Sequence, residues 1–130
     1  MIKLPHENVF VRLGVSLIHG IGVFAQEEIS SGTNVFPADT RPITWIPNTV
    51  LDDAALSDFQ RSLYQDFAIR RGDFLGCPAS FELLTVGWYC NEPDEGQEPN
   101  LIPTAEFDLI TSRHVRAGEE LTVRYSDFTS

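Results

Sequence analysis

Apolar and polar residues alternate over short distances in several parts of the chain. In NVFVRLG (8–14), Val9, Val11 and Leu13 occupy every second position, which is typical of a strand with one buried face. AEFDLITSRHV (105–115) alternates in the same way at Phe107 and Leu109. Further short apolar stretches, bounded by glycine, proline or polar residues, are IGVFA (21–25), NVF (34–36), TWI (44–46), FELLTVGWY (81–89) and LTVRY (121–125). The pattern predicts many short strands.

The middle of the chain has a different period. From Thr49 to Arg71, apolar side chains recur every four residues, as on one face of a helix that packs on the core. Ser57, followed by Asp58 and Gln60, is a candidate N-cap. Strands and helices do not alternate regularly, so a doubly wound parallel sheet is not expected. We expect a mainly β fold with a short α insert at about 49–71, in a single domain of residues 1–130.

The chain is acidic, because 19 Asp and Glu against 9 Lys and Arg give a formal net charge of −10. A protein that binds a phosphate backbone needs a cationic face, so no direct nucleic-acid binding is expected. The acidity fits attraction of a basic, lysine-bearing protein or peptide, and equally a role in solubility alone. No stretch has the roughly 20 apolar residues of a membrane span, and MIKLPHENVF lacks a signal-peptide pattern. We expect a cytoplasmic protein, with delivery to a host compartment left open.

Few cysteines and histidines are available for metal or thiol chemistry. Cys77 and Cys90 are expected to be reduced thiols, since one pair does not make a disulfide framework. His6, His19 and His114 have no metal-ligand spacing. No metal site is therefore predicted.

Three stretches are candidates for binding or catalysis. HGIGVFA (19–25) places Gly20 and Gly22 on either side of Ile21, where the backbone either approaches a ligand closely or forms a plain hairpin turn. RAGEELTVRY (116–125) ends at Tyr125, whose hydroxyl is either catalytic or structural. YCNEPDEGQEPN (89–100) is an acidic loop that contains Asn91 and closes on Pro-Asn. Each signal is weak by itself.

In their order, these stretches resemble the SET domain of protein-lysine methyltransferases. The resemblance covers nearly the whole chain: HGIGVFAQEEISSGTNVF, a helical insert, aromatic-x-Asn with a trailing Pro-Asn, and then VRAGEELTVRY. It is least marked between Pro37 and Leu83. The resemblance implies a minimal SET core similar to small bacterial and viral members. The implied fold is a β-clip of small curved sheets, in which a C-terminal pseudoknot brings the Asn91 segment next to the Tyr125 strand.

The resemblance also implies an activity. It is the transfer of a methyl group from S-adenosyl-L-methionine to a lysine side-chain amine of a protein substrate, without a metal. Tyr125 matches the catalytic tyrosine beside the transferring methyl group. The residues that the resemblance assigns to cofactor binding are Gly20, Ile21, Gly22, Tyr89, Asn91, Glu92 and Phe128, the last of which covers either the cofactor or the lysine channel.

The loop after Asn91 departs from the family motif. Glu92 stands where the family has His, and Glu95–Gln97 lengthen the loop before Pro99. In the family this position contacts adenine largely through its backbone, and Glu92 is expected to do the same. Three hypotheses remain open: an active lysine methyltransferase, a SET-like module that binds peptide or cofactor without catalysis, and an acidic interaction protein. The chain ends five residues after Tyr125, and we expect a homodimer partner or the substrate itself to complete the lysine channel.

Overall fold

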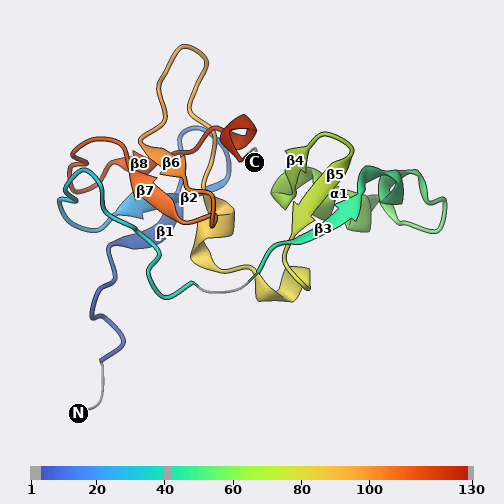
Figure 1. Ribbon diagram of the computed structural model, residues 1–130, viewed down its shortest axis with the longest axis horizontal. Coiled ribbons are helices and arrows are strands. Elements are labelled where there is room, and N and C mark those ends of the chain that lie inside the picture. Colours follow the sequence, from blue (N-terminus) through green and yellow to red (C-terminus); the bar gives the residue numbers. More distant parts are fainter. Residues whose placement is uncertain (1–3, 40–41, 129–130) are drawn as a thin grey trace.

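The computed structural model describes residues 4–39 and 42–128. Within them, short antiparallel strands form three small sheets, joined by turns and 3-10 helices and accompanied by one α-helix (Figure 1). The predicted mainly β fold with a short helical element is confirmed. The strands are β1 (Val11–Val15), β2 (Ile21–Ala25), β3 (Thr44–Pro47), β4 (Ile69–Arg71), β5 (Phe74–Cys77), β6 (Leu101–Pro103), β7 (Leu109–Thr111) and β8 (Glu120–Leu121). The helices are α1 (Asp58–Phe67) and the 3-10 helices η1 (Asn48–Asp52), η2 (Phe81–Leu83), η3 (Val86–Tyr89) and η4 (Tyr125–Asp127).

The body of the molecule combines the sheet β1-β2-β8 with the hairpin β6-β7. β1 pairs with β2 from Val11–Ala25 to Val15–Ile21, and the connecting turn contains Gly20 at φ 49°. β8 joins the other edge of β2, with Leu121 opposite Val23. The core between these elements is closed, because Val23, Leu101, Val115 and Leu121 have no exposed surface. Segments from both ends of the chain therefore share one core. Within it, the HGIGVFA stretch (19–25) lies beside the RAGEELTVRY stretch (116–125).

After β8 the C-terminal segment pairs with the chain at both ends of loop 92–99. Thr122 forms a parallel bridge with Asn91, and Val123 forms one with Leu101. The Val123 N–H donates to the Asn91 carbonyl, and the Leu101 N–H donates to the Thr122 carbonyl, both over 3.0 Å. The predicted meeting of the Asn91 segment with the residues before Tyr125 is thus observed. Passage of the chain end under a loop as a pseudoknot stays a prediction.

The insert consists of the sheet β3-β5-β4 with η1 and α1 on it, and it projects from the body (Figure 1). Ser57 caps α1 as the sequence predicts, and with Gln60 it forms a reciprocal capping box. Of the predicted helical region 49–71, α1 covers only residues 58–67, and residues 69–71 form β4. The apolar stripe is not a core face throughout, because Phe59 is 74% exposed and α1 has no buried residue.

Three expected strands have other structures. Residues 81–89 form η2 and η3, because the Ser80 side chain accepts from the Glu82 N–H and starts a tight turn. Residues 34–36 make one isolated bridge, from Asn34 to Ile110. The last strand ends at Leu121, and Tyr125 begins η4. In each case a short apolar run is compatible with several local structures, and the neighbours decide between them.

Arg71 connects the insert to the body. Its guanidinium carbon lies 4.2 Å from the Trp45 ring centroid and 5.2 Å from that of Phe107. Its Nε donates to the Phe128 carbonyl over 3.3 Å. A cation between two rings is stabilised by their π faces. Arg71 thereby fixes the position of the insert against the last described residue.

Candidate functional site

Asn91 lies at the centre of a hydrogen-bond network that joins distant parts of the chain. Its side chain is 7% exposed. Nδ2 donates to the His19 carbonyl and to Glu120 Oε2, both over 2.9 Å, and is 3.4 Å from the Ile21 carbonyl. The network ties Asn91 to the Gly20–Gly22 turn, although the two are about 70 positions apart in the sequence. The structure therefore brings Asn91 of the acidic loop next to the Gly20–Gly22 turn of the HGIGVFA stretch.

Gly22 is required by this network. The Glu120 carboxylate accepts from Ser16 Oγ over 2.7 and 2.9 Å and lies against the backbone at Gly22. A Cβ at Gly22 would be 2.3 Å from Glu120 Oε2, so a side chain there would displace the Glu120 carboxylate from its present position. The absence of a side chain is thus explained by the chain's own carboxylate. The sequence did not indicate Ser16 or Glu120 as site residues, because Glu120 carried no role of its own within RAGEELTVRY and nothing near Ser16 marks it.

Tyr125 faces the same segment from the other side. Its hydroxyl donates to the Cys90 carbonyl over 2.8 Å, directly before Asn91 in the chain. Burial raises the pKa of Tyr125 to about 12, and the negative charges that Cys90 and Glu92 can carry add to the increase. The hydroxyl therefore stays neutral at ordinary pH and can donate one hydrogen bond while accepting others.

Glu92 uses its side chain where only its backbone was expected to act. Its Oε1 accepts from the Tyr125 N–H over 2.8 Å. The carboxylate thus holds η4 at its first residue. Contact between the Glu92 backbone and a cofactor stays a prediction.

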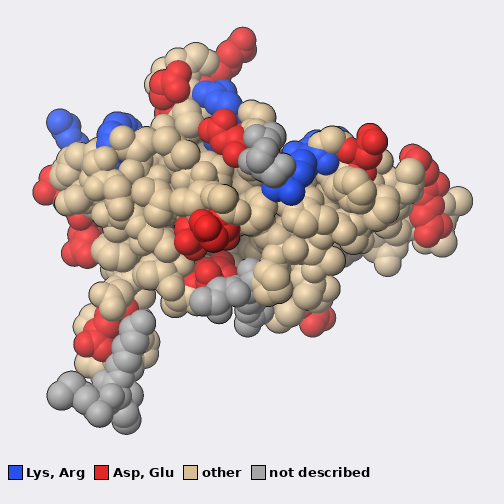
Figure 2. Space-filling model, viewed as in Figure 1, with Lys and Arg blue, Asp and Glu red and all other residues tan. Residues whose placement is uncertain are grey.

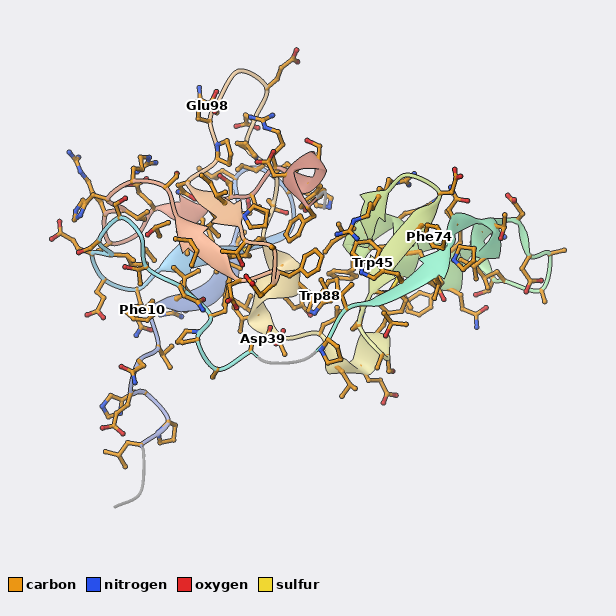
Figure 3. The ribbon with its side chains drawn as sticks, in the orientation of Figure 1. Phe10, Asp39, Trp45, Phe74, Trp88 and Glu98 are labelled. Atoms are coloured by element: carbon orange, nitrogen blue, oxygen red, sulfur yellow. The ribbon has the colours of Figure 1, made fainter. Side chains whose placement is uncertain are left out.

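The acidic loop extends away from this network. A turn from Asp94 to Gln97 closes it, with a 2.9 Å bond between their backbones and Gly96 at φ 83°. In Figure 3 the loop projects from the body with Glu98 near its tip. Residues Glu95–Gln97 therefore belong to the exposed part of the loop, whereas Asn91 and Asn100 at its ends are buried.

The remaining predicted site residues have different surroundings. Tyr89 packs edge-on against Phe67 at 5.4 Å between ring centroids. Ile21 is 47% exposed beside the network. Phe128 is buried, and its ring stacks on Phe107 at 6.3 Å. The structure joins Phe128 to Tyr125 by one backbone hydrogen bond and otherwise places it in a separate aromatic cluster.

That cluster borders a hollow of about 470 Å³, hereafter the aromatic hollow. Its aromatic wall is formed by Phe36, Trp88, Phe107 and Phe128. Among the predicted site residues Phe128 is the one that lines it. The hollow and the Asn91 network are thus two distinct candidate sites.

Neither site has the composition of a metal centre. Within the described residues, no group of three or more His, Cys, Asp or Glu side chains is placed to hold a metal ion. Over the same part of the chain, none of the helices has the length and apolar character of a membrane span. Cys77 and Cys90 are free and buried, and burial raises their thiol pKa values to about 11 and about 12.

Comparison with known proteins adds little. No protein-family model matches the chain, and no curated protein matches its sequence. One similar solved structure is that of a "putative histone methyltransferase" from Plasmodium falciparum, with 18% identity and a TM-score of 0.49 over 86% of this chain and 89% of that one. At this level of similarity, the likeness by itself decides neither the fold family nor the activity.

Proposed function

We propose that this protein is a SET-type methyltransferase, which transfers a methyl group from S-adenosyl-L-methionine to a lysine amine of a protein substrate. The observation that carries the proposal is the convergence of three motifs. Asn91 is bonded to the Gly20–Gly22 turn, and the Tyr125 hydroxyl is bonded to the carbonyl that precedes Asn91. These segments come from three distant parts of the chain, in the order that the SET resemblance implies.

The reaction requires alignment more than acid–base chemistry. The lone pair of the lysine nitrogen attacks the methyl carbon, the carbon–sulfur bond breaks, and the sulfonium becomes a neutral thioether. The nitrogen then loses a proton to water. A free lysine has a pKa of about 10.4, and a nearby sulfonium in a dry channel favours the uncharged amine. Orientation of the reactants can then supply about 7–11 kcal/mol of barrier reduction.

This chain has groups suited to such alignment. The Cys90 carbonyl and the Tyr125 oxygen lie 2.8 Å apart, so both can accept hydrogen bonds from one amine. Asn91 Oδ1 receives no hydrogen bond from the described residues, which leaves it as an acceptor for a donor on the cofactor. Because the pKa of Tyr125 is high, its hydroxyl carries no negative charge. A negative charge beside the lysine would favour the protonated amine, which cannot attack the methyl group.

A catalytically inactive binding module is the second candidate. Both amide hydrogens of Asn91 are used within the chain, and the Glu120 carboxylate lies where a cofactor would approach Gly22. A chain of this kind would bind S-adenosyl-L-methionine or a peptide without methyl transfer.

Two measurements separate these candidates. Calorimetric titration with S-adenosyl-L-methionine should show binding, and transfer of labelled methyl to a histone mixture should show turnover. Tyr125→Phe should lower turnover by roughly 10²-fold, as when one positioned donor is removed, with little change in cofactor binding. Tyr64→Phe is the matched control, because Tyr64 packs on Phe81 in the insert. Absence of cofactor binding at millimolar concentration would rule out the enzyme, and binding without turnover would favour the module.

A further inference from the structure

The aromatic hollow is a second site, independent of the Asn91 network. It lies between the segment that follows β2, the turn between β6 and β7, and the C-terminal Phe128. Figure 3 places Asp39 and Trp88, two of its lining residues, in the region between the body and the insert. Its volume of about 470 Å³ is within the range of small-ligand sites, roughly 300–1,000 Å³.

Phe107 holds a strained conformation in the wall of the hollow. Its φ is 66°, in the left-handed region, which a bulky aromatic residue rarely adopts. Hydrogen bonds of the Thr104–Asp108 turn maintain this conformation, including a 2.9 Å bond from the Phe107 N–H to the Thr104 carbonyl. Such strain is about 1–3 kcal/mol and is concentrated at functional sites. The conformation puts the ring against Phe128 and into the hollow.

Three carboxylates lie among the described residues that line the hollow. Glu106 and Asp108 flank Phe107, and Asp39 lies opposite, where its carboxylate accepts from the Thr85 hydroxyl. Among the described residues, neither Glu106 nor Asp108 has an ion pair, and the described lining contains no Lys or Arg. Figure 2 shows acidic side chains gathered near the middle of this face. Aromatic walls with carboxylates at the edge are complementary to a cation that has a flat or apolar body.

One ring of the aromatic wall, that of Phe107, already contacts a guanidinium. Arg71 lies over the rings of Trp45 and Phe107, at 4.2 and 5.2 Å from their centroids. Of these two rings, Phe107 lines the hollow and Trp45 does not. A planar guanidinium stacks on rings and forms paired hydrogen bonds with a carboxylate, which a lysine ammonium cannot do.

We propose that the aromatic hollow docks an arginine side chain of a partner protein. The guanidinium stacks against Trp88 and Phe107, and its N–H groups donate to the carboxylates of Asp108 and Glu106. The aliphatic part of the side chain covers the apolar wall. Docking of this kind requires neither cofactor nor methyl transfer, so it goes beyond the proposed activity.

Nα-acetyl-arginine amide is the probe, and the tryptophan indole N–H signals in the NMR spectrum are the readout. The chain has two tryptophans, and Trp45→Phe identifies the signal of Trp88. We expect saturable shifts of the Trp88 signal with the arginine probe. Nα-acetyl-citrulline amide has nearly the same shape without the charge. Its affinity should be lower by ~10-fold, as expected for the loss of one charged contact, or it should not bind measurably. Equal binding of the two would overturn the proposal, and so would equal binding of Nα-acetyl-lysine amide.

Variants locate the site. Asp108→Asn keeps the shape of the side chain and should weaken arginine binding by ~5–10-fold, a typical effect of one charge-assisted contact. Glu98→Gln changes the net charge by the same amount at the exposed loop and should leave binding unchanged (Figure 3). Equal weakening by both variants would show general charge attraction and contradict a specific site. The assay contains no cofactor, so its outcome is separate from that of the methyl-transfer measurements.

Discussion

Asn91→Ala is expected to destabilise the fold strongly, whatever the activity. The substitution removes two side-chain hydrogen bonds of 2.9 Å, one to the His19 carbonyl and one to the Glu120 carboxylate. A neutral bond contributes about 0.5–1.5 kcal/mol and a bond to a charged group about 1.5–3 kcal/mol. The sum predicts a loss of about 3 kcal/mol in the free energy of unfolding, on the order of a 100-fold change in the folding equilibrium.

Urea denaturation followed by tryptophan fluorescence measures this loss. Asn34→Ala is the matched control, because Asn34 Oδ1 accepts one neutral bond, from the Phe36 N–H over 3.0 Å. The control should lose only about 1 kcal/mol. If Asn91→Ala is no more destabilising than Asn34→Ala, the network around Asn91 does not hold the two motifs together, and the proposed site loses its structural basis.

Three further predictions concern the same region. Glu92→Gln and Glu92→Ala should both lower the pKa of Tyr125 from about 12, because each removes a negative charge beside it; only the Ala variant should also lose stability. Ultraviolet titration against Tyr125→Phe measures the pKa, and an unchanged value would contradict the contact. Gly22→Ala should destabilise by about 1–3 kcal/mol through overpacking, whereas Gly87→Ala, whose added methyl meets only contacts of 3.5 Å or more, should be nearly neutral. Cys90, with its raised pKa of about 12, should be inert to a thiol reagent at pH 8 until the chain unfolds; rapid labelling of the native protein would refute its burial.

The raised pKa of Tyr125 has a consequence for stability at high pH. The folded state keeps its phenolic proton up to a pH of about 12, whereas the unfolded chain loses it near the ordinary tyrosine pKa of 10.0. Between these values the unfolded state binds fewer protons, so stability falls as the pH rises. Tyr125→Phe should remove this part of the decline, which urea denaturation at several pH values in this range will show.

Local patterns in the sequence predicted some elements correctly and others not. The alternation before Gly14 gave β1, and Ser57 with Gln60 gave the capping box of α1. The four-residue spacing around Phe59 showed which face of the helix is apolar, but spacing contains no information on what covers that face. Phe59 is accordingly exposed. Local signals specify elements, and only the complete fold specifies burial.

The sequence predicted that the Asn91 segment and the Tyr125 segment meet, but it did not predict the hydrogen bonds that join them. The motif order brought Asn91 and Tyr125 together correctly, because both belong to recognisable stretches. The partners of Glu120 could not be predicted: Ser16 is 104 positions away, and no periodicity relates them. The strained φ of Phe107 was also unpredictable, since left-handed positions are usually marked by Gly, Asn or Asp.

The length of the acidic loop is compatible with the firm placement of Asn91. Loop 92–99 has eight residues, and without Glu95–Gln97 it would have five. Closing the longer loop costs only about 0.4 kcal/mol more, from the logarithmic dependence of closure entropy on length. Each end is held more strongly than that. The Asn91 carbonyl accepts from Val123, and the Asn100 side chain donates to the Glu120 carbonyl and accepts from the Thr122 N–H, over 2.9 and 2.8 Å. At about 1 kcal/mol per bond, the C-terminal segment fixes both ends, and residues 94–98 between them are exposed to solvent.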